Sequence, residues 1–278
     1  MDQLYNNTSI ECSKLVTNRY STSFSLGIKV FEKSLRSPVY AIYGFVRLAD
    51  EIVDTFHKSD KQALLKRFRE DTHRAIEEGI SLNPILNAFQ LMVNQYSIDR
   101  ELIDAFLDSM SMDLYNIDYD KAGYERYIYG SAEVVGLMCL KVFCNNDETR
   151  YRSLEDYAKS LGSAFQKINF LRDIKSDFIE RGRVYFPGIS YHDFTNDEKK
   201  EIEDDIKHDF DQALIGIKKL PNGAKLGVYL AYKYYLNLFA KIKRAPAQKV
   251  KEERIRVNDS RKAYLLVKSM LKWQLRLI

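Results

Sequence analysis

Apolar residues recur at intervals of three and four along most of this chain. The pattern is clear over residues 102–110 and again over residues 154–168. This spacing places the apolar side chains on one face of an α-helix, whereas the alternation typical of β-strands is scarce. No proline lies between Pro84 and Pro187, so the long middle stretch lacks a helix breaker of that kind. The pattern therefore predicts an all-α protein.

The same periodicity, with proline and glycine as boundary signals, predicts the extent of each helix. The helices are expected at residues 8–20, 38–56, 60–79, 84–95, 99–116, 121–144, 151–178, 197–217, 223–243 and 254–276. The principal loop is predicted at residues 181–194, directly after an acidic helix. No internal repeat or change in composition marks a second domain, so we interpret residues 1–278 as one helical domain.

Charge is unevenly distributed along the chain. The 278 residues are 45% apolar, enough for one sizeable core, and carry a net charge of +4. Residues 241–278 contain twelve Lys and Arg against three Asp and Glu, so the basic character is concentrated at the C-terminus. The remainder of the chain is acidic overall.

Cysteine usage and the N-terminal segment bear on the cellular compartment. The chain has three cysteines, an odd number, and none of them forms a Cys-x-x-Cys motif. This argues against a disulfide framework and favours a reducing environment. The N-terminal segment lacks a basic patch followed by an apolar run, and no stretch reaches the roughly 18 uninterrupted apolar residues of a membrane span. We therefore expect a soluble, cytoplasmic protein.

Two pairs of aspartates lie four residues apart. They are Asp50 with Asp54 and Asp173 with Asp177. On a helix, the two carboxylates of each pair would share one face, about 5–6 Å from each other. The interval alone is weak evidence, because other aspartate pairs show it at residues 104/108, 193/197 and 205/209. A solvated acidic face is the ordinary explanation of such a pair.

The setting distinguishes the first two pairs from the others. Each lies among apolar residues that indicate partial burial, and each has an arginine close by, Arg47 or Arg172. Asn169 extends the second row by one helical turn. Like charges at this spacing destabilise a helix by about 0.2–0.5 kcal/mol per pair, and partial burial raises that cost. Carboxylate and amide oxygens favour Mg²⁺, which commonly bridges carboxylates to phosphates. The pattern therefore indicates a Mg²⁺–diphosphate site, and an ion-paired acidic face is the alternative.

Taken together, five segments resemble the phytoene/squalene synthase family. They are STSFSLG (21–27), YAIYGFVRLADEIVD (40–54), YIYGSAEVVGLM (127–138), QKINFLRDIKSD (166–177) and RGRVYFP (181–187). Their order and spacing also match, and the chain is most similar to the bacterial phytoene synthases. The resemblance implies an all-α isoprenoid synthase bundle, with the two aspartate motifs facing each other at the mouth of a deep apolar cavity.

The resemblance also implies roles for the residues at matching positions. Asp50, Asp54, Asp173 and Asp177 would be catalytic and would hold Mg²⁺, for which Mn²⁺ could substitute, with Asn169 as a further metal ligand. The substrate diphosphates would be bound by Ser21, Ser23, Tyr43, Arg47, Gln166, Arg172 and Tyr235. Tyr129 would be catalytic, with simple packing as the alternative for one tyrosine among nineteen.

A few positions keep two interpretations or depart from the family pattern. Arg181 and Arg183 either close over the departing diphosphate or cap the end of a helix. Thr22 stands where the family usually has a lysine, which removes one phosphate contact. Glu133 stands within the usual Ala-Gly-Thr-Val-Gly run, and either inserts a carboxylate beside the prenyl tunnel or faces outward.

By resemblance, the expected reaction is the head-to-head condensation of two geranylgeranyl diphosphates to phytoene. It would proceed through a cyclopropylcarbinyl diphosphate and would serve carotenoid biosynthesis. A squalene or dehydrosqualene synthase using two farnesyl diphosphates is the alternative, and it would differ in tunnel depth. A phytoene synthase would need no nicotinamide cofactor. A non-catalytic assembly protein with the same fold is the alternative of another class, against which the intact aspartate pairs argue.

The predicted C-terminal helix combines Lys and Arg with Leu, Met and Trp side chains. Such a helix can lie on an anionic membrane, so peripheral membrane association is a hypothesis beside prenyl diphosphate binding. A packed terminal helix with a solvated face is the alternative. Nucleic-acid binding is not expected, because no aromatic-basic motif accompanies the basic residues.

Overall fold

The computed structural model describes residues 2–115 and 119–275, apart from the side chains of Thr22, Ser23 and Arg181. The elements are α1 (Asp2–Tyr20), α2 (Thr22–Lys29), α3 (Lys33–Asp54), α4 (Lys61–Glu78), α5 (Pro84–Tyr96), α6 (Arg100–Met112), α7 (Lys121–Ile128), η1 (Tyr129–Glu133), α8 (Val134–Cys144), α9 (Glu148–Arg181), α10 (Asn196–Lys219), α11 (Asn222–Arg244), α12 (Ala247–Glu252) and α13 (Asp259–Gln274). Here η1 is a turn of π-helix between α7 and α8. The described residues contain no strand, which confirms the all-α fold class.

Side-chain caps explain where several helices begin. The carboxylate of Asp147 accepts a hydrogen bond from the backbone N–H of Arg150 at the start of α9. Thr195 and Glu198 form a reciprocal capping box at the start of α10. At the other end of α9, Gly182 adopts φ 65°, a left-handed conformation that glycine takes without a steric cost. These local signals fix both ends of the longest helix, which carries the second aspartate motif.

The structure differs from the predicted helices in several places, and α1 begins at Asp2 rather than at residue 8. Helices α2 and α12 are short and were not predicted, and α3 begins at Lys33, before Pro38 rather than at it. Proline near a helix start removes one backbone hydrogen bond but does not prevent the preceding turn from forming. The last helix begins at Asp259, because residues 254–258 have no regular secondary structure and Asn258 caps the helix. The predicted helices 99–116 and 254–276 end at residues outside the described part.

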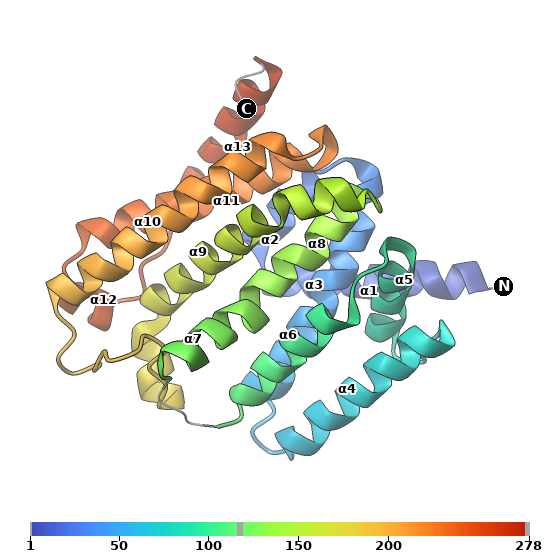
Figure 1. Cartoon of the computed structure of the whole chain (residues 1–278), viewed down its shortest axis with the longest axis horizontal. Helices are drawn as coiled ribbons and strands as arrows, with labels where there is room; N and C mark the ends of the chain where they lie inside the picture. The colour runs from blue at the N-terminus through green and yellow to red at the C-terminus, as the bar shows by residue number, and fades with distance from the viewer. Residues whose placement is uncertain (1, 116–118, 276–278) are drawn as a thin grey trace.

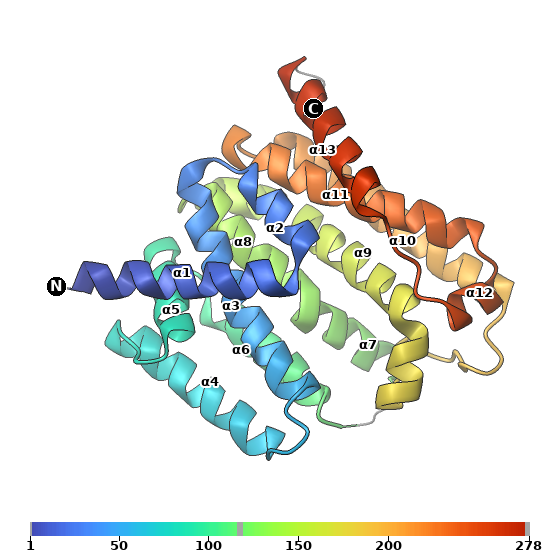
Figure 2. The ribbon, with the colours of Figure 1, turned by 180° about the vertical axis from the view of Figure 1, so that it is seen from behind.

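Helix α9 lies in the middle of the bundle. It packs against α8 and η1 on one side and against α10 on the other (Figure 1). From behind, α1 crosses α3 and α5, and α13 lies beside α11 at the edge of the molecule (Figure 2). Gly162 of α9 allows the close approach to η1, since an added Cβ would lie 2.8 Å from the carbonyl oxygen of Ala132. The position of the second aspartate motif is therefore set by contacts along most of α9.

Two large apolar clusters form the core. The first contains residues of α3, α4, α5, α6 and α8. Its Phe45 is fully buried and stacks on Phe89 with ring centroids 3.9 Å apart. The second joins the C-terminal half of α9 to α10 and α11, with Phe170 stacked on Tyr185 at 4.1 Å. Since α3 belongs to the first cluster and the end of α9 to the second, the two aspartate motifs project from different parts of the core.

The stretch Lys121–Cys144, which comprises α7, η1 and α8, is long and apolar enough to cross a membrane by length and composition. In the folded chain, 61% of its most apolar window is buried inside the protein. Its side chains Leu137 and Met138 belong to the first core cluster, and Tyr127 and Ile128 belong to the second. Length and composition alone therefore do not distinguish a buried core helix from a membrane-spanning helix.

Candidate active site

The two aspartate motifs lie near the C-terminal ends of their helices. Asp54 is the last residue of α3, and Asp177 is four residues from the end of α9. The C-terminal end of a helix carries partial negative charge from its unpaired carbonyl groups, so carboxylates are disfavoured there. Both helix ends therefore add to the negative potential of the aspartates and favour a cation at this place.

One cavity of about 960 Å³ brings the two motifs together. Its lining includes most of the residues predicted from the sequence: Ser21, Tyr43, Arg47, Asp50, Asp54, Gln166, Asn169, Arg172, Asp173, Asp177 and Tyr235. Apolar side chains such as Val46, Val53 and Phe170 form part of the wall, but polar and charged residues predominate. The chemistry of the cavity around the aspartate motifs therefore suits a charged group.

In the first motif, Arg47 is shared among several partners. Its guanidinium lies 2.6 Å from Glu51 and 3.6 Å from Asp50, and stacks over the ring of Tyr20 at 4.4 Å. Burial raises the pKa of Asp50 to about 7, although Arg47 lowers it, and the nearby carboxylate of Asp54 raises it further. The Asp50 side chain is 34% exposed, but the space it faces is the cavity. A second cation beside Asp50 would relieve this repulsion.

In the second motif, Asp173 lies between two arginines. Arg172 from the same helix reaches its carboxylate at 2.5 Å, and Nε of Arg254 reaches Oδ1 at 2.7 Å. The side chain of Asp173 is 16% exposed, and that of Asp177 is buried. The carboxylate of Asp173 is therefore neutralised from two sides, one of them supplied by the C-terminal part of the chain.

Polar side chains between the motifs are joined to one another. The hydroxyl of Tyr235 donates a hydrogen bond to Oδ1 of Asn169 at 3.3 Å, and Asn169 donates to Gln166 at 3.5 Å. The ring of Tyr235 stacks on Phe165 with centroids 3.8 Å apart. Because the three polar side chains come from α9 and α11, this chain of hydrogen bonds holds the two helices in register at the cavity wall.

The other predicted contributors come from the start of the chain and from α3. Tyr43 stacks on Phe24 with ring centroids 4.4 Å apart, and burial raises its pKa to about 12, so its hydroxyl stays protonated. The side chain of Ser21 caps α2 by accepting a hydrogen bond from the N–H of Phe24. The side chains of Ser23 and Arg181 lie outside the described part of the structure.

Tyr129 is not among the residues that line this cavity. It is partly buried and packs against the first core cluster. Tyr127, two residues earlier, lines the cavity instead. The π-helical turn that begins at Tyr129 changes the direction of successive side chains, which a regular helical pattern does not predict. A catalytic role for Tyr129 therefore stays a prediction.

Several residues of the cavity wall were not chosen from the sequence as site residues, among them Asp113, Tyr127 and Tyr185, and Arg183 was considered only as a flap or a helix cap. The hydroxyl of Tyr127 donates to Asp113 at 2.8 Å, and the buried Arg183 lies 3.1 Å from Asp113, 3.3 Å from the hydroxyl of Tyr185 and 3.9 Å from Asp54. The side chain of Arg183 thus belongs to the buried wall, and its backbone N–H donates to the carbonyl oxygen of Asp177 near the end of α9 at 2.9 Å. The RGRVYFP motif contains two of these residues, but nothing near Asp113 in the sequence connects it to them.

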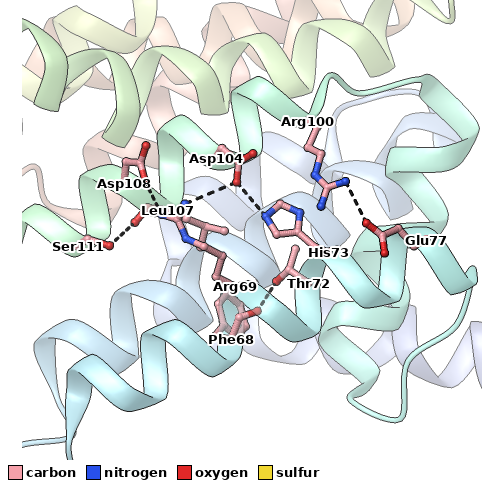
Figure 3. A network of polar contacts seen from close by, with 10 residues as sticks. All are labelled: Phe68, Arg69, Thr72, His73, Glu77, Arg100, Asp104, Leu107, Asp108 and Ser111. Atoms are coloured by element: carbon pink, nitrogen blue, oxygen red, sulfur yellow. Dashed lines mark hydrogen bonds and ion pairs between the residues drawn. The ribbon is translucent and has the colours of Figure 1, made fainter.

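Other aspartate pairs with the same spacing serve a different purpose. Asp104 and Asp108 lie on α6 and pair with Arg69 of α4 at 3.6 and 2.5 Å, and Asp104 also contacts His73 at 2.9 Å (Figure 3). These contacts join two helices at the surface. The spacing by itself therefore does not identify a metal site.

A second acidic pair supports the position of α9. Asp205 and Asp209 of α10 hold the buried Lys167 at 2.5 and 2.8 Å. Lys167 is the neighbour of Gln166, so this contact fixes the part of α9 that faces the cavity. Glu133 points toward the same cluster, and burial together with Asp209 raises its pKa to about 7 although Lys159 and Lys167 lower it.

The donor atoms present fit Mg²⁺ that is shared with a substrate. Among the described residues, no three acidic, histidine or cysteine side chains come close enough to hold one ion. Each aspartate pair therefore supplies only part of a coordination shell. Because Mg²⁺ usually keeps several waters and binds through one or two carboxylates plus substrate phosphates, such partial oxygen sites are the kind it uses.

Comparison with known proteins places the chain among related sequences and folds. The 4,4'-diapophytoene synthase of Staphylococcus haemolyticus is 26% identical over 195 residues, 67% of this chain and 65% of that protein. The match thus spans just under two thirds of that relative. The phytoene synthase of Rhodobacter capsulatus is 26% identical over 282 residues, 94% of this chain and 80% of that protein.

The fold is shared with a solved structure of a dehydrosqualene synthase in complex with ligand. The two chains superpose with a TM-score of 0.82 at 20% identity, over 98% of this chain and 99% of the other. A sequence profile of the family described as squalene/phytoene synthase matches residues 17–261, which include both aspartate motifs and the segments that line the cavity. The chain therefore belongs to the squalene/phytoene synthase family.

Proposed function

We propose that this protein joins two geranylgeranyl diphosphates head to head and forms phytoene through a cyclopropylcarbinyl diphosphate, as a prenyltransferase of carotenoid biosynthesis. The observation that carries the proposal is the single cavity lined by both aspartate pairs together with Arg47 and Arg172. Membership of the family supports this reaction class. The similarity to the phytoene synthase of Rhodobacter capsulatus over 94% of the chain favours phytoene as the product.

The proposed cofactor is Mg²⁺, with Mn²⁺ as a substitute and no nicotinamide cofactor. Asp50, Asp54, Asp173 and Asp177 would hold it, with Asn169 as a further ligand. When bound, the metal supplies positive charge that stabilises the diphosphate as it leaves.

The arginines and polar side chains would bind and orient the diphosphates. Nε of Arg47 is buried without a hydrogen-bond acceptor among the described residues, so a diphosphate oxygen would satisfy it. Arg172 is beside Asp173 at the same wall and can form two parallel hydrogen bonds to a phosphate group. The protonated hydroxyl of Tyr43 is a donor on the Arg47 side, and Gln166 and Tyr235 are polar groups on the opposite wall.

Loss of the diphosphate leaves an allylic carbocation that must be protected from water. Tyr43 lines the cavity together with Arg47, and its ring, which stacks on Phe24, presents π-electrons that attract positive charge. Tyr235, whose ring stacks on Phe165, does the same on the α9–α11 side. Since water would capture the cation, exclusion of solvent by these aromatic side chains favours carbon–carbon bond formation.

A second candidate is the condensation of two farnesyl diphosphates to squalene or dehydrosqualene. It is favoured by the likeness to a dehydrosqualene synthase structure with a TM-score of 0.82 and by the 4,4'-diapophytoene synthase relative. The two candidates share every polar residue of the site and differ in the length of the prenyl chain that is accepted.

Product analysis distinguishes these candidates. Purified protein is incubated with Mg²⁺ and either the C15 or the C20 diphosphate, with and without NADPH, and the hydrocarbon is identified by mass spectrometry. A C40 product from the C20 substrate that needs no NADPH is expected. A C30 product alone would establish the second candidate, and no product from either substrate would support a non-catalytic helical protein.

We also propose that this enzyme is cytoplasmic and attaches to the membrane surface through α13. One face of this helix exposes Tyr264, Val267 and Leu271, which are 48%, 56% and 54% exposed. Lys268 and Lys272 accompany them. A helix with exposed apolar residues beside lysines binds an anionic lipid surface, which is also where prenyl substrates accumulate.

A further inference from the structure

The segment between α12 and α13 runs across the second aspartate motif. We call residues 253–258 the C-terminal strap. Its first and last residues, Glu253 and Asn258, have extended backbone conformations. The side chains between them alternate: Ile255 and Val257 pack against the second core cluster, whereas Arg254 and Arg256 line the cavity. Alternation with a period of two is the property of an extended chain, so the strap can hold two arginines over the cavity while its apolar residues stay packed.

Lysines from two helices hold the strap in place. Nζ of Lys175, on α9, donates to the carbonyl oxygen of Glu252 at 3.0 Å, immediately before the strap. Nζ of Lys241, on α11, donates to the carbonyl oxygen of Arg256 at 2.9 Å. These contacts fix the backbone on both sides of Arg254 without involving its side chain. The guanidinium can therefore change partner while the strap remains in position.

The side chain of Arg254 is paired with Asp173 but is not enclosed. Nε lies 2.7 Å from Oδ1, and Nη2 lies 3.4 Å from Oδ2. The Arg254 side chain is 51% exposed, compared with 22% for Arg172, which contacts the same carboxylate. A half-exposed ion pair contributes little to stability, since water screens it and holding a long side chain costs entropy. Arg254 is thus the more easily displaced of the two arginines.

We propose that Arg254 is a diphosphate-binding residue that occupies Asp173 until metal and substrate arrive. The inference rests on the proposed function, because it assigns a further residue to the same site. A divalent cation on Asp173 repels the guanidinium, which then turns to a diphosphate oxygen on the same wall. Arg256 lines the cavity from the same strap and adds a second positive charge. Arg254 therefore competes with the metal when diphosphate is absent and assists binding when it is present.

This exchange predicts opposite effects of one substitution on two equilibria. Isothermal titration calorimetry with the full-length protein measures the affinity for Mg²⁺ alone. A second titration measures the affinity for inorganic pyrophosphate at saturating Mg²⁺. In Arg254→Gln, Mg²⁺ alone should bind about threefold tighter, because a weak competitor is gone. Pyrophosphate should bind about tenfold more weakly, because a charged hydrogen bond is lost. Arg254→Lys should restore part of the pyrophosphate affinity.

The control is Arg261→Gln, which removes an arginine of α13 that does not line the cavity and should change neither equilibrium. Equal affinities in Arg254→Gln and wild type for both ligands would overturn the inference, as would weaker binding of both. Wild-type protein that binds no pyrophosphate at any Mg²⁺ concentration would instead refute the proposed function. The two failures are therefore separate outcomes of one experiment.

Discussion

Nη1 of Arg183 lies 3.1 Å from Oδ1 of Asp113, and both side chains are buried. Arg183 also donates a hydrogen bond to the backbone carbonyl of Asp113, and Tyr127 donates to the carboxylate. The pair joins the chain after α9 to the end of α6 and brings a guanidinium within 3.9 Å of Asp54. It therefore connects the stability of the fold to the position of the first aspartate motif.

Removing one member of this pair should destabilise the protein. Asp113→Ala leaves the charge of Arg183 buried without its carboxylate, so we expect the free energy of unfolding to fall by about 3–5 kcal/mol. Urea denaturation measures this. Asp108→Ala is the matched control, because its pairing with Arg69 is at the surface (Figure 3) and should contribute at most about 1 kcal/mol. Equal effects of the two substitutions would contradict the importance of the buried pair.

The aspartate motifs should be required for turnover but not for folding. Asp50→Ala and Asp173→Ala should each lower the rate of product formation by at least about a thousandfold, since charge stabilisation at the leaving group contributes several kcal/mol. Circular dichroism should show unchanged helix content. The control is Asp104→Ala. Asp104 also lies four residues from another aspartate but outside the cavity, so this variant should retain activity. Full activity in both motif variants would remove the catalytic assignment.

Glu133 should make stability depend on pH. Burial raises its pKa from 4.5 to about 7, so between these values the folded protein binds more protons than the unfolded chain. Stability should therefore decrease as pH rises from about 4.5 to about 7 and then level off. Glu133→Gln has no ionisable carboxyl group at this position, so it should not lose stability in this way as the pH rises.

The comparison of variants at two pH values isolates this effect. Near pH 8, Glu133→Gln should be about 1–3 kcal/mol more stable than wild type, whereas near pH 4.5 the two should be similar. Urea denaturation at both pH values measures the difference. Glu125→Gln, at an exposed position of α7, should show no such dependence. A Glu133→Gln variant that is less stable at pH 8 would show that the carboxylate is needed by Lys167.

Membrane attachment should depend on the exposed apolar residues of α13. Val267→Ser combined with Leu271→Ser should reduce flotation with vesicles of anionic lipid by about tenfold or more, because two apolar side chains are lost from the interface. Leu82→Ser is the control, since Leu82 is 95% exposed but lies between α4 and α5. Wild-type protein that stays unbound at low salt would refute the attachment.

The sequence alone indicated the features that depend on neighbouring residues. Helical periodicity predicted the all-α class and most helices, because apolar residues one turn apart must share a buried face. The aspartates at four-residue spacing, with Arg47 and Arg172 beside them, were identified because α-helix geometry determines which side chains share a face. The structure places both motifs at one cavity, as the resemblance implied.

Tertiary structure decided which distant residues meet. Asp113 and Arg183 are 70 residues apart, and Arg254 and Asp173 are 81 apart, so no local pattern joins them. The π-helical turn at Tyr129 and the C-terminal strap at residues 253–258 interrupt the periodicity from which the helices were predicted. Such pairings arise when the folded chain brings opposite charges from distant segments to the wall of one cavity. Burial and distance, which only the folded chain has, determine them.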